Sequence, residues 1–247
     1  MQLRRRYKIL IIVLLVALVI FTGFIVWAET PSSPMKQAID ALQSDSNITV
    51  INGQWLTFKP TNANYTTGLI IYPGGRVDYR SYAPLAHAIA NEGYLTIIVP
   101  MPLNLAVFGA NAANDVIASH PEITSWAIGG HSLGGTMAAQ FAYQNPSKVQ
   151  GLVLWAAYPA SGNNLSKYAL LVTTIHGSND GLVSTSQIQN SLEILPPTTV
   201  YVEIEGGNHA QFGYYGDQSG DNPAAITREA QQSLTLNATG ELLQELK

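Results

Sequence analysis

The sequence predicts an α/β domain with a mostly parallel sheet of about seven to eight strands and helices on both faces, preceded by one transmembrane helix. Three observations support this prediction. Short apolar runs alternate with helical segments along most of the 247 residues, the pattern of a parallel sheet buried on both sides. A glycine-rich motif, Gly130–Gly134, joins one such run to an Ala-rich segment. A long apolar run also stands near the N-terminus.

That apolar run covers residues 9–28, interrupted only by Thr22 and Gly23, and matches the roughly 20 residues that a spanning helix needs. Basic residues precede it within residues 1–8, so the positive-inside rule puts the N-terminus in the cytoplasm and the rest of the chain outside. We expect an uncleaved signal anchor in the cell membrane. The alternative is a signal peptide cleaved after Ala28, which would give a secreted protein.

The remaining chain divides into a linker with a short helix at 29–45 and an α/β domain at 46–247. A hairpin opens the domain, with strands at 48–51 and 54–58 around Asn52-Gly53, a pair that favours a two-residue type I′ turn. Alternating elements follow: strands at 68–72, 95–99, 125–129, 151–156, 170–175 and 199–204, and helices at 81–91, 106–119, 135–143, 186–195 and from about 223 onward.

Composition excludes several classes of function. The chain has no cysteine, so disulfides, thiolate metal sites and a cysteine nucleophile are excluded. From residue 9 onward, eight basic residues stand against sixteen acidic ones, a net charge of −8. An acidic body lacks the electrostatic footprint of a nucleic-acid-binding protein. Neither a metal nor an organic cofactor is expected.

The glycine-rich motif has the form Gly-x-Ser-x-Gly with Ser132 at its centre. Between a strand and a helix, this motif forms a nucleophile elbow, a turn so sharp that the serine hydroxyl stands exposed above the sheet. A serine hydroxyl needs a base to remove its proton, and the base needs a third group to orient it. We therefore looked for an acid and a histidine in later loops.

Two loops after later strands supply these partners. Asp180 follows the strand ending at 175, and His209 follows the strand ending at 204, which gives the order Ser, Asp, His that this architecture uses. Asp217 and Asp221 come after the histidine and break that order. We expect His176, at the end of its strand, to hydrogen-bond the acid loop.

An oxyanion hole requires two backbone N–H groups aimed at the developing charge. One should come from Leu133, directly after the nucleophile, and the other from the loop after the strand at 68–72. We favour Gly75 as the second donor, with Gly74 or Arg76 as alternatives one position away.

With these motifs, the chain from about residue 48 onward resembles the α/β-hydrolase family, and most of all a small lidless branch related to dienelactone hydrolases. The resemblance rests on Gly-His-Ser-Leu-Gly, Gly-Ser-Asn-Asp-Gly and Gly-Asn-His. Dienelactone hydrolases use cysteine, so Ser132 places this chain nearer the esterases. A second departure is Tyr-Pro-Gly-Gly before the oxyanion donor, where many members have His-Gly.

The predicted function is therefore cleavage of small-molecule carboxylic esters through an acyl-enzyme. Only residues 157–169 are available where a lid usually enters, too few for a helical cap, so the site should be open, with Tyr158 and Phe108 as candidate walls. Amide or peptide cleavage and acyl transfer use the same triad and stay open as alternatives. A non-catalytic binding protein on this fold is a further alternative.

Overall fold

The computed structural model describes residues 2–61 and 65–247. Met1 and residues 62–64 lie outside this description. The side chains of residues 2–6, among them the three arginines of the basic flank, also lie outside it.

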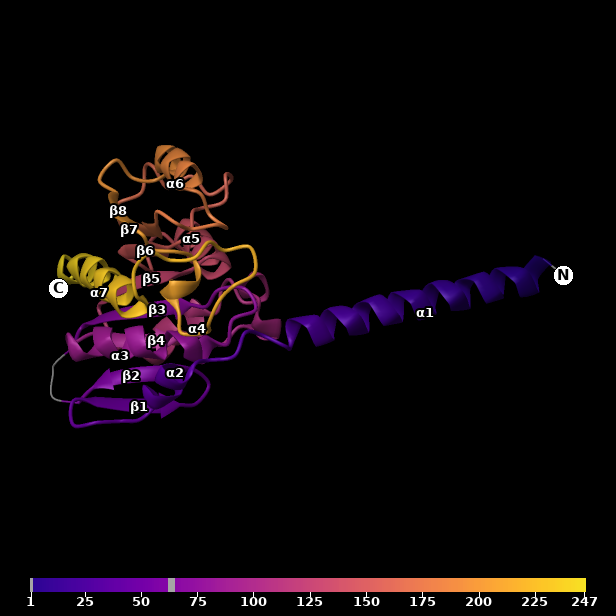
Figure 1. Cartoon of the computed structure of the whole chain (residues 1–247), viewed down its shortest axis with the longest axis horizontal. Coiled ribbons are helices and arrows are strands. Elements are labelled where there is room, and N and C mark those ends of the chain that lie inside the picture. The colour runs from indigo at the N-terminus through magenta and orange to yellow at the C-terminus, as the bar shows by residue number, and fades with distance from the viewer. Residues whose placement is uncertain (1, 62–64) are drawn as a thin grey trace.

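Eight strands form one sheet in the order β1-β2-β4-β3-β5-β6-β7-β8 (Figure 1). β2 runs antiparallel to both of its neighbours, and every other pair is parallel. The predicted number of strands and their mostly parallel arrangement are confirmed. The strands are β1 (Ile48–Asn52), β2 (Leu56–Pro60), β3 (Thr67–Tyr72), β4 (Leu95–Ile98), β5 (Ser125–His131), β6 (Gly151–Trp155), β7 (Leu171–Gly177) and β8 (Val200–Ile204).

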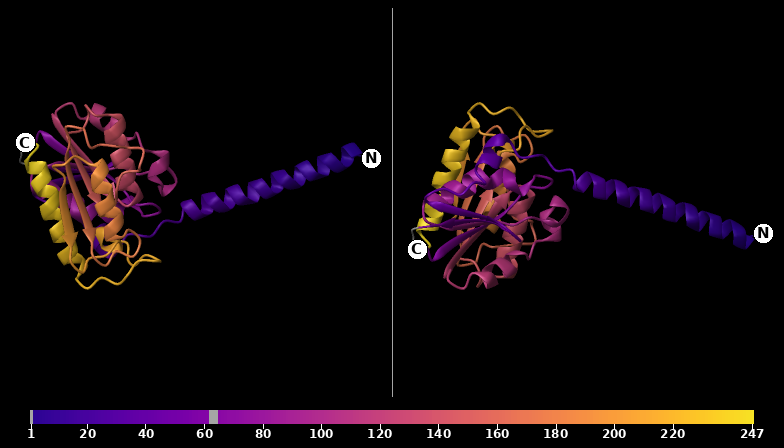
Figure 2. Two further views of the ribbon diagram at one scale, coloured as in Figure 1. Left: turned by 90° about the horizontal axis from the view of Figure 1, so that it is seen from above. Right: turned by 90° about the horizontal axis from the view of Figure 1, so that it is seen from below.

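Helices cover both faces of this sheet, as predicted. α3 and α7 pack on one face, and α4, α5 and α6 pack on the other; Figure 2 shows α7 lying along one side of the strands. The helices are α1 (Gln2–Ala28), α2 (Lys36–Asp40), α3 (Ala83–Asn91), α4 (Ala113–Ser119), α5 (Leu133–Gln144), α6 (Thr185–Ser191) and α7 (Arg228–Gln244). Short 3-10 turns are η1 (Tyr79–Tyr82), η2 (Pro102–Asn104), η3 (Ala106–Phe108), η4 (Leu192–Ile194) and η5 (Ala210–Phe212).

The central strand β3 shows why these apolar runs are continuous. Successive side chains of a strand point to opposite faces. Leu69 and Ile71 therefore pack into the core beneath α3 and α7, whereas Ile70 and Tyr72 pack into the core beneath α5. All four side chains are fully buried, so an alternating polar pattern would leave polar groups in one of the two cores.

The predicted two-residue turn at Asn52-Gly53 is wrong, although the hairpin itself forms. Asn52 pairs with Leu56, which leaves a three-residue connection in which the Gly53 N–H donates to the carbonyl of Trp55 at 3.1 Å. Neither Asn52 nor Gly53 has the positive φ of a type I′ turn. Burial of Leu56 and Phe58 sets the register, because a one-residue slip would turn both side chains outward.

The predicted helix at 106–119 is divided in two. η3 ends at Phe108, and α4 begins only at Ala113. Gly109 follows η3, and glycine is a poor helix former. The hydroxyl of Tyr72 then holds the intervening turn, because it donates to the carbonyl of Ala110 at 3.1 Å and accepts the N–H of Ala113 at 2.8 Å.

α1 is the one helix in the described chain that is long and apolar enough to cross a membrane, over Tyr7–Ala28. It projects away from the domain (Figures 1 and 2). The segment after it is bonded to the domain, since Ser32 pairs with Val77 and the Met35 N–H donates to the carbonyl of Tyr214 at 2.7 Å.

The parallel pairing brings the carboxyl ends of six strands, β3 to β8, to one edge of the sheet, where ligands bind in open α/β folds. At this edge β5 and α5 pass very close to β3. A Cβ added at Gly130 would lie 2.5 Å from the carbonyl oxygen of Tyr72, and one at Gly134 would collide with the same oxygen. The turn between β5 and α5 can form only with glycine at these positions.

We expect Gly130→Ala to lower the free energy of unfolding by about 1–3 kcal/mol or more, because the added methyl overpacks a backbone contact that cannot move aside. The matched control is Gly162→Ala, where an added Cβ has no neighbour within 4 Å and the change should stay within about 0.5 kcal/mol. Urea unfolding of the two variants measures the difference. Equal stability of the two would contradict the close approach of β3 and β5.

Candidate active site

Ser132 stands at the turn between β5 and α5 in a strained backbone conformation. Its φ of 53° and ψ of −124° lie in a region that costs a non-glycine residue about 1–3 kcal/mol. The surrounding structure holds this conformation, because the Ser132 N–H donates to the carbonyl of Trp155 in β6 at 2.9 Å. This is the backbone geometry expected of a nucleophile elbow.

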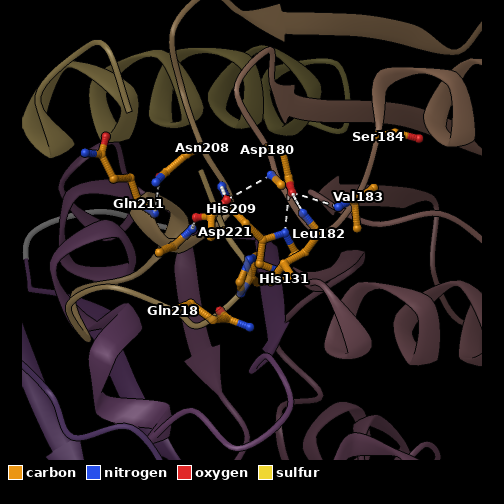
Figure 3. Close-up of polar contacts among 12 residues, drawn as sticks. His131, Asp180, Leu182, Val183, Ser184, Asn208, His209, Gln211, Gln218 and Asp221 are labelled. Atoms are coloured by element: carbon orange, nitrogen blue, oxygen red, sulfur yellow. Dashed lines mark hydrogen bonds and ion pairs between the residues drawn. The ribbon is translucent and has the colours of Figure 1, made fainter. Parts of the chain in front are cut away.

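Asp180 and His209 meet from the loops after β7 and β8 (Figure 3). His209 Nδ1 lies 2.8 Å from Asp180 Oδ2, and both side chains are buried. The other oxygen, Oδ1, accepts the N–H groups of Leu182 at 2.8 Å and Val183 at 2.7 Å. These bonds fix the orientation of the carboxylate.

The bond to Asp180 determines which nitrogen of His209 can act as a base. An ionised carboxylate only accepts hydrogen bonds, so Nδ1 of neutral His209 carries the proton and Nε2 has a free lone pair. Nε2 is buried and has no hydrogen-bond partner among the described residues. A buried acceptor without a partner is unusual in a folded protein, and the lone pair on Nε2 is free to accept a proton.

His131, the residue before Ser132, brings the elbow next to this base. The rings of His131 and His209 lie 4.5 Å apart between centroids. Burial, and secondarily the nearby His209, hold the pKa of His131 well below its ordinary value. His131 is therefore neutral near pH 7 and packs beside His209 without repelling a proton from it.

The loop after β3 contains the three candidate oxyanion donors, and their hydrogen bonds distinguish them. The Gly74 N–H donates to the hydroxyl of Tyr82 at 2.9 Å, and the Arg76 N–H donates to the carbonyl of Asn104 at 2.8 Å. Gly75 lies between them, and its N–H makes no hydrogen bond within the described part of the chain. A Cβ added at Gly75 would lie 3.1 Å from Leu133 Cδ2, so the two favoured donors are neighbours.

Leu133 is the first residue of α5. Its N–H is therefore one of the four at a helix start that have no acceptor within the helix. The positive end of the α5 dipole also lies here, which favours a negative charge on a bound oxygen. The start of α5 therefore lies directly after Ser132 and beside Gly75.

Tyr82 holds this loop in place, a role that no pattern in the sequence indicates. Its hydroxyl accepts the Gly74 N–H and lies 2.8 Å from His131 Nδ1. Burial raises the pKa of Tyr82, so the hydroxyl keeps its proton and donates it to Nδ1. In the sequence, Tyr82 is one apolar position within a predicted helix, with nothing to separate it from core residues.

Asp221 also has a role that chain order did not suggest. Oδ1 accepts the N–H of Gly181 at 3.0 Å and of His209 at 3.3 Å, and Oδ2 accepts the N–H of Ala210 at 2.8 Å. One carboxylate therefore bonds both the acid loop and the histidine loop. Figure 3 shows Asp221 beside His209.

His176 does not bond the acid loop, so that expectation is wrong. Its Nε2 lies 3.0 Å from Glu203 Oε2 and 3.0 Å from the hydroxyl of Tyr201, both on β8. The strand register explains this, because His176 pairs with Glu203 and side chains at paired positions lie on the same face.

The two candidate wall residues differ in their surroundings. Tyr158 is half-buried, and its hydroxyl accepts the amide of Gln187 at 3.1 Å. Phe108 is 54% exposed, and its ring stands edge-on to Phe24 of α1 with 6.5 Å between centroids. The segment between β6 and β7, which contains Tyr158, has no helix in the described structure.

Comparison with known proteins agrees with this architecture. The sequence profile of the alpha/beta hydrolase family matches residues 68–233. The chain belongs to the α/β hydrolase family. The match covers β3 through the start of α7 and includes all the loops described above. A comparison with curated protein sequences gives no match.

Solved structures of other α/β proteins show the same fold. Est1E from Butyrivibrio proteoclasticus is 13% identical, covers 81% of this chain and 99% of its own, and has a TM-score of 0.57. The esterase Est2 from Thermogutta terrifontis is 14% identical over 80% of this chain and 91% of its own, with a TM-score of 0.59. A predicted CIB-like hydrolase from Thermoplasma acidophilum is 16% identical, covers 79% of this chain and 98% of its own, and has a TM-score of 0.57.

We expect Tyr82→Phe to destabilise the fold by about 1–3 kcal/mol, because it leaves the Gly74 N–H and His131 Nδ1 without a partner. It should also lower hydrolase turnover about tenfold, equivalent to 1.4 kcal/mol, because the loop that contains Gly75 loses the hydrogen bond that holds it. Urea unfolding and kcat on p-nitrophenyl butyrate measure the two effects.

The control is Tyr72→Phe, which removes another buried hydroxyl that bonds only Ala110 and Ala113. This variant should lose similar stability with little change in kcat. If both variants lost turnover equally, the effect of Tyr82 would be one of general stability.

Proposed function

We propose that this protein is a membrane-anchored serine hydrolase that cleaves carboxylic esters. The observation that carries the proposal is the buried Asp180–His209 pair, which leaves His209 Nε2 without a partner among the described residues. The ring of His209 lies against His131, the residue before Ser132 in the strained turn. Within the hydrolase fold this combination suits attack on an acyl carbon, because each group has the partner that its chemistry requires.

In the proposed reaction, Ser132 Oγ attacks the ester carbonyl while its proton passes to His209 Nε2. The carbonyl oxygen becomes an oxyanion that the N–H groups of Leu133 and Gly75 stabilise. The tetrahedral intermediate collapses, and the leaving alcohol takes the proton from His209. Water then attacks the acyl-enzyme by the same route, which releases the carboxylic acid and restores Ser132. Asp180 holds the imidazole tautomer and stabilises the imidazolium.

An open site supports ester cleavage by this proposed hydrolase. The segment 156–170 forms no helical cap in the described structure, and Tyr158 stands at its start, where it can contact an acyl or alcohol group. Phe108 remains a proposed second wall. One structural neighbour, Est2 from Thermogutta terrifontis, is described as an esterase. We further propose a relation to the dienelactone hydrolases, with serine as nucleophile in place of cysteine.

We expect Ser132→Ala or His209→Ala to lower kcat by several powers of ten while the domain stays folded, because the triad acts as a unit. Asp180→Asn should cost roughly 10⁴ in kcat, because the amide favours the wrong imidazole tautomer. The exposed Asp217 supplies the matched control, Asp217→Asn, which should turn over at the wild-type rate. Steady-state kinetics on p-nitrophenyl butyrate measure all four variants.

Labelling by a fluorophosphonate separates an enzyme from a binding protein on this fold. Wild-type protein should react at Ser132, and Ser132→Ala should not. Wild-type protein that stays unlabelled and inactive, or an Asp217→Asn variant that loses turnover while Asp180→Asn keeps it, would contradict the proposed site.

We also propose that α1 is an uncleaved anchor and that the domain faces away from the cytoplasm. The basic flank before the span supports this orientation. The hydrolase should therefore stay with membranes through high-salt and carbonate washes, and protease added to intact cells or protoplasts should remove it. Recovery of full-length protein in the soluble cytoplasmic fraction would contradict both parts, and recovery outside the cell beginning at Glu29 would show a cleaved signal peptide instead.

A further inference from the structure

The last turn of α1 is held by side chains from the edge of the sheet where the parallel strands end, which we call the catalytic edge. Arg76 Nε donates to the carbonyl of Trp27 at 2.8 Å, and its Nη2 donates to the carbonyl of Thr30 at 2.8 Å. The amide of Asn104 donates to the carbonyl of Ala28 at 3.0 Å. The carbonyls of Trp27 and Ala28 belong to the last turn of α1, where no N–H group of the helix donates to them. The Arg76 guanidinium also lies 4.3 Å from the Trp27 ring centre, a cation–π contact.

The residues that make this cap are continuous with the loop that carries the proposed oxyanion donor. Arg76 directly follows Gly75, and its backbone N–H donates to the carbonyl of Asn104. Arg76 and Asn104 both have positive φ, 55° and 53°, so each is held in a strained conformation by these contacts. Leu105 Cδ2 lies 3.7 Å from the Cβ position of Gly75. The anchor, η2 and the Gly75 loop therefore form one connected unit.

Apolar side chains of the domain lie at the level of the anchor's last turns. Phe24 is four residues before the end of the span, which is about 6 Å along the helix axis at 1.5 Å per residue. The ring of Phe108 packs edge-on against the ring of Phe24. Val107 is 48% exposed and Phe108 54% exposed. If residues 7–28 cross a bilayer, η3 lies at its surface beside Trp27, where aromatic residues are enriched at the membrane interface.

We propose that the catalytic edge rests on the bilayer surface and that the enzyme hydrolyses an ester carried by the membrane, with the ester group at headgroup level. The substrate class rests on the proposed function. The occupant of the exposed surface formed by Val107 and Phe108 is the lipid interface, because the helix that enters the bilayer leaves the domain at that surface. The C-terminus of the chain lies on the opposite side of the domain (Figure 1).

The absence of cysteine allows this orientation to be measured without reference to activity. Val107→Cys and Val200→Cys each introduce one thiol for an environment-sensitive NBD fluorophore. The two positions match closely, with 48% and 47% exposure, but Val200 begins β8 and so lies at the opposite edge of the sheet. Each labelled full-length protein is reconstituted in phosphatidylcholine vesicles that contain nitroxide-labelled lipid.

We expect blue-shifted emission and strong nitroxide quenching at position 107, and water-like emission with little quenching at position 200. Equal quenching at the two positions, or none at 107, would overturn the orientation.

The substrate class is tested in the same vesicles with two esters that share a leaving group. p-Nitrophenyl palmitate partitions into the vesicles, and p-nitrophenyl butyrate stays in water. Val107→Asp should lower the rate on the palmitate ester at least tenfold and change the rate on the butyrate ester less than twofold. Val200→Asp should change neither rate.

The quenching measurement and the ester assays together separate failure of this inference from failure of the proposed function. Butyrate cleavage by a protein whose label at 107 is not quenched would overturn the membrane orientation and leave the hydrolase intact. Quenching at 107 with no cleavage of either ester would overturn the proposed function, and with it the substrate class. An equal decrease in the rates on both esters in Val107→Asp would show a general defect of the site. That result would contradict a membrane-borne substrate.

Discussion

The close approach of β3 to the turn between β5 and α5 is the constraint on which the rest of the structure depends. Gly130 and Gly134 pass the carbonyl of Tyr72 with no room for a side chain. This contact places Ser132, the start of α5 and the loop after β3 within reach of one another. Because β3 and β5 are central strands, the flanking cores beneath α3, α5 and α7 hold the contact rigidly. The strain at Ser132 persists because this packing leaves its backbone no alternative.

Buried polar groups then fix the loops around that turn. The Gly74–Tyr82–His131 chain and the Asp221 carboxylate each satisfy several groups that would otherwise be buried without partners, at a cost of about 1–3 kcal/mol apiece. A loop held by such bonds has few alternative positions. Hydrogen bonding therefore positions the loops at this edge. Within the described residues, the Gly75 N–H and the buried His209 Nε2 are among the groups left without a partner there.

The contact between α1, the candidate membrane span, and this edge links the helix to the same hydrogen-bond network. Arg76 bonds the helix end with its side chain and η2 with its backbone, so the helix is attached to the domain by a defined joint rather than a free tether. The joint constrains which face of the domain can meet a bilayer. It also places the Gly75 loop, the proposed source of an oxyanion donor, one residue away from the anchor's cap.

The sequence by itself determined the alternation of strands and helices, the elbow at Ser132 and the candidate partners Asp180 and His209. Each depends on local signals, namely apolar periodicity, glycine spacing and position after a strand, which the chain carries in adjacent residues. The roles of the three candidates stay predictions, although the structure places Asp180 and His209 in hydrogen-bond contact.

The tertiary structure alone decided the hairpin register, the break between η3 and α4, the partners of His176 and which N–H of the Gly74–Arg76 loop is unbonded. These depend on contacts between residues far apart in the sequence, such as Tyr82 with His131 and Arg76 with Trp27. Local propensity carries no information about such contacts, because their energy depends on which groups the completed sheet brings together and on which of them burial deprives of water.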